Sequence, residues 1–249
     1  MKKLALSIFA ISNILLFSSC EEDAKIEDQH PHLTLSVEHK VDAQDLEFDT
    51  IKYVNSVGHK YEVQTLKYFI SNVELHKAGG SKTTLKGPFY IDAEDPTTFT
   101  LDDQVDIPTG TYEKISLIFG LDSTANISNT LTSIEAIGMN WPDPMGGGYH
   151  YMKLEGSYDS LQLNIPKNYA VHTGASMGDP YHINLELPNS NFTVSTEDIS
   201  IKIQMNVNEW FTDPNNYDFA AYPSMIMVNM QAQMALKANG NSVFTAIIN

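Results

Sequence analysis

The stretch LTLSVEHKV, residues 33–41, alternates apolar and polar side chains, and His39 falls among the apolar positions. A period of two is typical of a β-strand that buries one of its faces. The stretch ISIKIQMNV, residues 199–207, repeats this pattern much later in the chain. Both stretches therefore predict half-buried strands.

Short segments of the same character fill most of the remaining chain. Strands are predicted at residues 61–75, 89–91, 112–121, 149–155, 161–165, 181–187 and 243–248. Two segments favour helices instead: residues 128–137, with Ser128 as a cap, and residues 225–238, with Ser224 as a cap. Many short strands and one or two short helices predict an all-β fold, an antiparallel β-sandwich or barrel-like single domain.

The N-terminus predicts export. Two lysines precede a short apolar run that ends in Phe17-Ser18-Ser19-Cys20, and Cys20 is the single cysteine of the chain. A charged segment before a short apolar segment is typical of a secretory signal. Small residues before a lone cysteine resemble the lipobox of bacterial lipoproteins. We therefore expect a signal peptide at residues 1–19 and acyl chains on Cys20, which would anchor the protein to a membrane.

The residues after Cys20 predict a tether. Residues 21–31 are polar and lack an apolar pattern, so we expect a flexible lipid-anchored tether over residues 20–31 and a folded domain over residues 32–249. Glu21-Glu22-Asp23 resembles the surface-export signal of Bacteroidetes lipoproteins. The expected location is therefore the cell envelope, at the periplasmic or the outer face of the outer membrane.

The composition excludes several classes of function. The chain has no arginine and a formal net charge of −16. Nucleic-acid binding requires a cationic surface, so we expect no nucleic-acid partner. No standard catalytic motif occurs, and no pair of carboxylates has a diagnostic spacing, so we do not expect an enzyme. The lone cysteine leaves no internal disulfides, and a large apolar core must stabilise the fold.

Three histidines and two methionines are the strongest candidates for chemistry. His39 lies on an apolar strand face, His150 alternates with Met152 and Leu154, and His172 lies at a strand end. A buried imidazole must find a partner for each ring nitrogen, and either a metal ion or a backbone hydrogen bond can supply it. Met145 and Met177 lie in glycine-containing loops, where a thioether would suit Cu(I), although methionine also fills irregular cores.

Several segments resemble a known family. Residues 66–75, LKYFISNVEL, are similar to the LKYYISNIEL segment of MbnP-like proteins, and residues 138–156, GMNWPDPMGGGYHYMKLEG, are similar to the family's tryptophan loop and the strand after it. Weaker matches complete the resemblance, namely residues 120–123, residues 208–211, Asn239-Gly240 and Phe244. The resemblance covers nearly everything after the tether and implies a β-rich fold.

The resemblance also implies a copper site. MbnP-like proteins bind one copper through two histidines and a tryptophan oxidised to kynurenine by a partner di-haem oxidase of the MauG type. Carried onto this sequence, Trp141 matches that tryptophan, and His39, His150 and His172 match recurring histidines. Met145 is an auxiliary candidate. The second tryptophan of the family's WxW form is replaced by Asp143 here, and the paired cysteines of some members are missing.

An alternative function is a surface module that binds glycan or a partner protein without metal. The aromatic residues that would then form its binding platform are Trp141, Tyr149, Tyr151, Trp210 and Tyr217.

Overall fold

The structure is a computed structural model that describes residues 31–249, except residues 86, 136–137, 160–164 and 223. The expected signal peptide, Cys20 and almost all of the tether lie outside the described residues, and so does most of the strand predicted at 161–165. Among the helices of the described part, none has the length and apolar character needed to cross a membrane.

The smaller sheet brings together the two stretches that define the pattern of the sequence. Its five strands are β1 (His32–Val41), β2 (Gln44–Asp45), β8 (Thr100–Asp106), β14 (Ile199–Asn206) and β15 (Phe244–Ile248). β1 and β14 pair in parallel, with Leu33 opposite Ile199 and His39 opposite Met205. In this register the apolar side chains of both strands point to the same face of the sheet, toward the core. The parallel pair departs from the predicted antiparallel pairing, whereas β1 pairs with β2 and β8 in antiparallel fashion.

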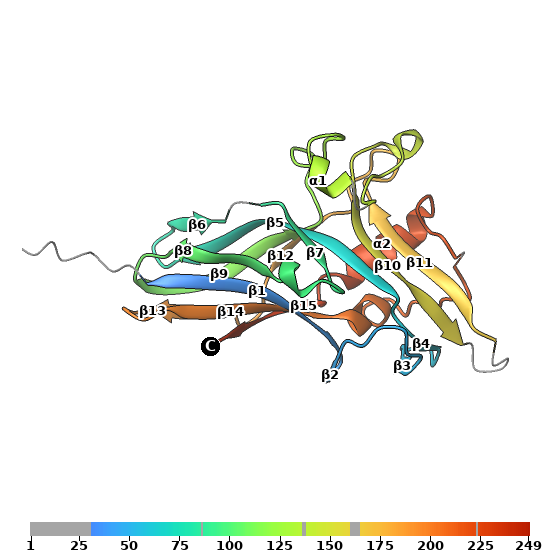
Figure 1. Ribbon diagram of the computed structural model, residues 1–249, viewed down its shortest axis with the longest axis horizontal. Coiled ribbons are helices and arrows are strands. Elements are labelled where there is room, and N and C mark those ends of the chain that lie inside the picture. The colour runs from blue at the N-terminus through green and yellow to red at the C-terminus, as the bar shows by residue number, and fades with distance from the viewer. Residues whose placement is uncertain (1–30, 86, 136–137, 160–164, 223) are drawn as a thin grey trace, which may run out of the picture.

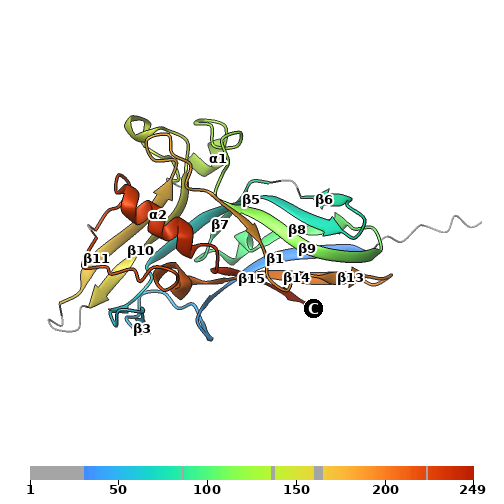
Figure 2. The same ribbon diagram turned by 180° about the vertical axis from the view of Figure 1, so that it is seen from behind.

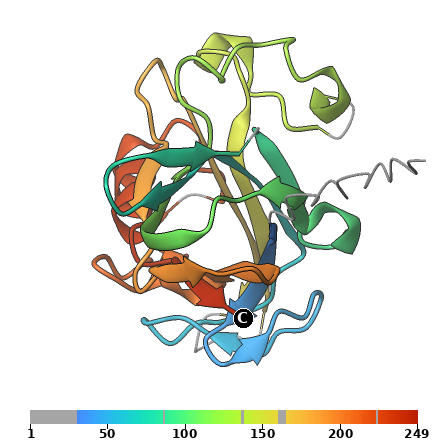
Figure 3. The same ribbon diagram turned by 90° about the vertical axis from the view of Figure 1, so that its left-hand side faces the viewer.

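The larger sheet curls around the other side of the core. Its ten strands are β3 (Tyr53–Val54), β4 (Lys60–Tyr61), β5 (Thr65–Lys77), β6 (Lys82–Thr84), β7 (Phe89–Asp92), β9 (Gly110–Phe119), β10 (His150–Asp159), β11 (Lys167–Gly174), β12 (Ile183–Glu186) and β13 (Phe192–Val194). β5 is central because it pairs with β9 and with β10, and β10 pairs in turn with β11. Seen from the end in Figure 3, the curled strands enclose the core between them. The predicted all-β fold is confirmed.

Helices add little to the framework. α1 (Thr132–Glu135) is one turn, and the described part of the chain also has 3-10 helices at Pro96–Thr98, Asp143–Met145 and Val207–Phe211. α2 (Met230–Asn239) lies beside β10 and β11, as Figure 2 shows from behind. Its cap is the Asn229 side chain, which accepts from the Ala232 N–H, and not Ser224 as predicted. The helix begins late because Met225 forms a β-bridge with Ala170 instead.

Among the described residues, two apolar clusters form the interior. The large one lies between the sheets. The small one lies at the end of the molecule where β10 begins and β11 ends, and its members are Phe69, Leu121, Met139, Tyr149, Tyr151 and Tyr181. This cluster packs under the loop of residues 138–149, which we call the Trp loop. The Trp loop is thereby fixed directly above the paired ends of β10 and β11 (Figure 1).

Candidate metal centre

A bulge in β10 places His150 on the same face as His172. His150 pairs with Gly174, but Met152 pairs with Thr173, so β10 accommodates one extra residue between the two pairs. Residues that pair directly share a face, and Gly174 shares its face with His172 because side chains alternate along a strand. His150 therefore faces His172. The prediction that it shares a face with Met152 and Leu154 was wrong, because alternation in a sequence does not reveal a bulge.

The two imidazoles and one indole form a compact group. The ring centroids of His150 and His172 are 4.9 Å apart, and the ring planes lie nearly perpendicular at 86°. The centroids of His150 and Trp141 are also 4.9 Å apart. His150 is 6% exposed and Trp141 is 1% exposed, so the group is largely shielded from water.

Hydrogen bonds fix which ring nitrogens are free. His150 Nδ1 lies 3.1 Å from the Met139 carbonyl, and His172 Nε2 lies 2.6 Å from Glu155 Oε1. Carbonyl and carboxylate oxygens only accept, so both of these nitrogens carry the proton. The opposite nitrogens, His150 Nε2 and His172 Nδ1, are buried and have no hydrogen-bond partner. In the neutral imidazoles these two nitrogens carry the lone pairs, so they are a pair of potential metal ligands on adjacent rings.

The electrostatics favour neutral His150. Burial, and secondarily the neighbouring His172, lowers the pKa of His150 from 6.5 to about 4. The hydrogen bond from His172 lowers the pKa of Glu155, so its carboxylate stays ionised at neutral pH. A neutral imidazole with a lone pair, and a second imidazole oriented by a carboxylate, are the forms that bind a metal ion.

Glycines seat Trp141 against the histidines. A Cβ at Gly174 would lie 2.5 Å from Trp141 Cε3, so the indole packs directly on the backbone of β11. The turn before His150 requires glycine because Gly146, Gly147 and Gly148 all have positive φ. Trp141 Nε1 donates to the Met145 carbonyl at 3.3 Å, which closes the loop. The indole also lines a hollow of about 270 Å³ beside Asn140 and Asp143.

The structure does not bring His39 into this group. His39 lies on β1, where its Nε2 hydrogen-bonds with the Tyr68 hydroxyl at 3.0 Å and its ring contacts Phe99. Burial lowers its pKa from 6.5 to about 4. Met145 does lie close to the group, since its carbonyl accepts from Trp141, and its side chain is half-buried. Across the described ranges, no cluster of three or more His, Cys, Asp or Glu is arranged to hold a metal ion, so the centre rests on two histidines and Trp141.

Sequence reasoning missed two contributors. Glu155 and the Met139 carbonyl orient the imidazoles, yet neither stood out in the sequence. Aligning residues 150–159 with 167–174 as a hairpin would have put Glu155 near His172, because Glu155 pairs with Ala170, two positions from His172. The role of a backbone carbonyl leaves no signal in side-chain identities.

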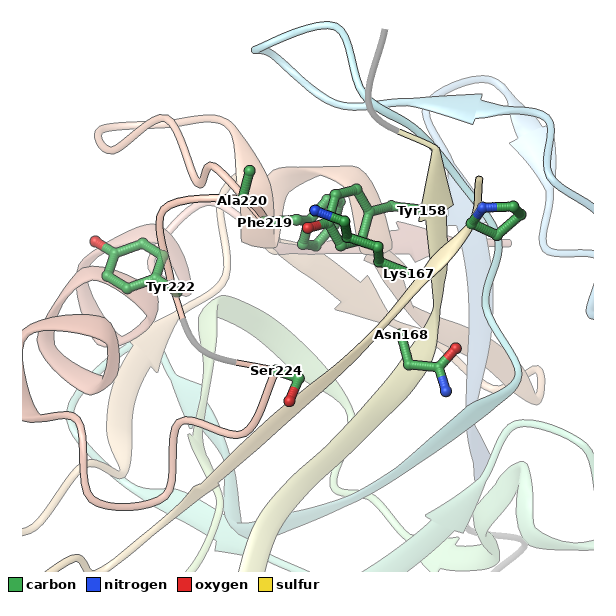
Figure 4. A pocket seen from close by; sticks show the side chains of 8 residues that line it. Tyr158, Lys167, Asn168, Phe219, Ala220, Tyr222 and Ser224 are labelled. Carbon is green, nitrogen blue, oxygen red and sulfur yellow. The ribbon is translucent and has the colours of Figure 1, made fainter. Parts of the chain in front are cut away.

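The aromatic residues suggested as a glycan platform are buried. Their exposed fractions are 2% or less for Trp141, Tyr149, Tyr151, Trp210 and Tyr217. A pocket of about 540 Å³ with other aromatic residues lies at the opposite ends of β10 and β11, lined by Tyr158, Lys167, Phe219 and Tyr222 among others (Figure 4). The aromatic platform is therefore not supported, and the Figure 4 pocket is separate from the group of His150, His172 and Trp141.

Comparisons with known proteins assign the chain to a family. No protein with a curated function matches it. Among solved structures, MbnP from Methylosinus trichosporium matches with a TM-score of 0.50 and 12% identity, over 87% of this chain and 98% of that chain. At that identity the match supports the fold alone. The sequence model of the family described as MbnP matches residues 30–230, which is more than half of the chain. The chain therefore belongs to the MbnP family, as its resemblance to MbnP-like proteins predicts.

Proposed function

We propose that this protein binds one copper ion between His150 Nε2 and His172 Nδ1, with Trp141 beside it. The observation that supports the proposal best is the pair of buried ring nitrogens without partners, each on a ring whose other nitrogen is hydrogen-bonded. An orphaned buried nitrogen is unfavourable, and two on adjacent rings are satisfied together by one cation. Membership of the MbnP family associates the chain with copper.

The donor set favours copper over hard cations. Imidazole suits copper and zinc, whereas Mg²⁺ and Ca²⁺ prefer oxygen ligands. A tetrahedral zinc site usually has at least three protein side chains, and this group offers two histidines and an indole. The half-buried Met145 is close enough along the Trp loop to supply a thioether as an auxiliary ligand.

Metal analysis of purified protein tests the proposal. The histidine centre should hold about one copper per chain in protein from copper-supplied cells, so the double variant His150→Ala plus His172→Ala should carry about one copper per chain less than wild type. His76→Ala is the matched control, because His76 hydrogen-bonds with Ser116 on β9 and lies outside the group. Wild-type copper content in the double variant would refute the site, and zinc in place of copper would refute the metal.

We propose further that the protein is a lipoprotein of the cell envelope that handles or acquires copper and does not act as an enzyme. The lipobox-like sequence before Cys20 and the acidic residues after it support this location. The resemblance to MbnP-like proteins supports a di-haem oxidase as the partner that converts Trp141 to kynurenine. Intact mass analysis of the native protein tests both points, since it detects acyl chains on Cys20 and oxidation of Trp141. Unmodified masses from cells that carry the oxidase would contradict them.

A further inference from the structure

Exposed methionines occur on two segments attached to the region of the proposed copper centre: the Met177 N–H donates to the Met145 carbonyl, and Gln233 of α2 donates to the His172 carbonyl. Met177, Met230 and Met234 are 68%, 51% and 62% exposed, although long apolar side chains are normally buried. Met177 follows β11 in the chain, and Met230 and Met234 belong to α2. These three exposed apolar residues are therefore all methionines with a thioether sulfur, and they come from two segments far apart in the sequence.

Two hydrogen bonds hold these segments side by side. Ser176 Oγ donates to the Met227 carbonyl at 2.7 Å, just before α2. Lys237 Nζ donates to the Pro180 carbonyl at 2.9 Å, in the last turn of α2. The loop of residues 176–180 thus runs along α2 from one end to the other. Met177 lies between the two attachments on the loop, and Met230 and Met234 lie between them on the helix.

The helical spacing places both α2 methionines on one exposed face of the helix, next to Lys237. Met230, Met234 and Lys237 are at positions i, i+4 and i+7, which lie on one face of a helix. Lys237 reaches the Pro180 carbonyl of the loop from the edge of that face, on which Met230 and Met234 are exposed. Three flexible, exposed thioethers thus lie on two segments that are held together, and we call this surface the methionine seam (Met177, Met230 and Met234).

The methionine seam connects directly to the Trp loop. The Met177 N–H donates to the Met145 carbonyl at 2.7 Å, and the same carbonyl accepts from Trp141 Nε1 at 3.3 Å. Met177 has φ of 55°, a strained value for a residue with a side chain, and this hydrogen bond helps to hold it. A series of contacts therefore leads from the exposed seam to the buried histidines: Met177 hydrogen-bonds to Met145, Met145 hydrogen-bonds to Trp141, and the Trp141 ring packs against His150.

We propose that the methionine seam is a second, solvent-accessible site for Cu(I) that loads the His150–His172 centre. This inference rests on the proposed function. Thioether sulfur is a soft ligand that selects Cu(I), and unbranched methionine side chains can converge on an ion without rearranging the backbone. Leucine would serve equally well if this surface only bound an apolar partner. Methionine differs from leucine in offering a sulfur atom that can bind a metal ion. The transfer needs no redox step, because copper stays Cu(I) and exchanges thioether ligands for imidazole nitrogens.

Methyl NMR with Ag(I), a closed-shell substitute for Cu(I), tests binding at the seam. In protein labelled at the methionine methyl groups, Ag(I) should shift the signals of Met177, Met230 and Met234. Met225 is the internal control, since it is 64% exposed but fixed beside Ala170 in β11. The shifts should persist in the His150→Ala plus His172→Ala variant. Equal shifts at Met225, or none at the seam, would overturn the proposal.

Leucine substitutions test the function of the seam. The triple variant Met177→Leu, Met230→Leu and Met234→Leu keeps the side-chain volumes and leaves the fold unaffected, because all three positions are exposed. In competition with a Cu(I) chelator, wild type should bind about two Cu(I), and the triple variant and the histidine double variant about one each. Loading of the histidine centre should be about tenfold slower in the triple variant. Unchanged stoichiometry and rate in the triple variant would overturn the seam alone, whereas unchanged stoichiometry in the histidine variant would overturn the proposed function.

Discussion

His39 and His150 are two buried histidines that look alike in most respects and differ in one. They are 8% and 6% exposed, and burial lowers the pKa of each to about 4. His39 packs against Tyr68 and Phe99 in the core, and its Nε2 has the Tyr68 hydroxyl as a partner. His150 has its Nδ1 bonded, its Nε2 orphaned and a second histidine beside it.

The difference shows that burial and a lowered pKa do not identify a metal ligand. Desolvation alone produces both at His39, where the ring contributes to packing. What distinguishes the His150 region is a second buried histidine beside it, with one ring nitrogen of each histidine hydrogen-bonded and the other without a partner. A histidine that only packs and a histidine that binds metal should therefore respond differently to substitution.

The largest expected effect is on copper affinity. His150→Ala should weaken copper binding by about a hundredfold or more, because it removes one of two imidazole ligands. His39→Gln should leave copper affinity unchanged, since His39 lies in the other sheet. Competition with a copper chelator measures both variants. Equal losses of copper affinity in the two variants would show that His39 is also a ligand.

The stability of the metal-free protein should depend on His39 at acidic pH. Its pKa is about 4 in the folded protein and 6.5 ordinarily, so the unfolded chain takes up the proton first as the pH falls. The lowered pKa of His39 therefore adds up to about 3 kcal/mol to the free energy of unfolding. This added stability is fully present above pH 6.5 and is lost as the pH falls toward 4. His39→Gln should flatten this part of the pH dependence. Denaturant unfolding at a series of pH values measures it, and the same slope in both proteins would contradict the prediction.

Gly174→Ala should disturb the His150 region and destabilise the fold by about 2 kcal/mol. The added Cβ would come within 2.5 Å of Trp141 Cε3, so the indole must move away from the histidines. Thermal unfolding and indole fluorescence report the change. In a Trp141→Ala background the same substitution should have little effect, and an undiminished effect there would place the strain elsewhere.

The smallest expected effect comes from Glu155→Gln. Loss of the charged acceptor should leave His172 less firmly oriented and weaken copper binding about tenfold. Glu38→Gln is the matched control beside His39, where Glu38 accepts from Gln204. Isothermal titration with copper measures both. An effect of Glu38→Gln as large as that of Glu155→Gln would point to general charge rather than orientation.

Much of the fold could be predicted from local patterns. The alternation at residues 33–41 and 199–207 corresponds closely to β1 and β14, because strand faces repeat every two residues whatever their partners are. The pattern did not predict that these strands pair in parallel, since pairing depends on residues distant in sequence. Helix α2 was predicted in the right region but five residues too early, because Met225 is recruited by β11.

The residue types of the candidate centre could be identified in the sequence alone. They are the glycines that turn the Trp loop, Trp141, His150 and His172. The tertiary structure alone decided how they combine. The bulge in β10 turned His150 toward His172, and Glu155 and the Met139 carbonyl selected which nitrogens stay free. Periodicity reports only whether a side chain meets water or core. The partner of each ring nitrogen is set by atoms that folding brings together from other segments of the chain, and local sequence carries no record of them.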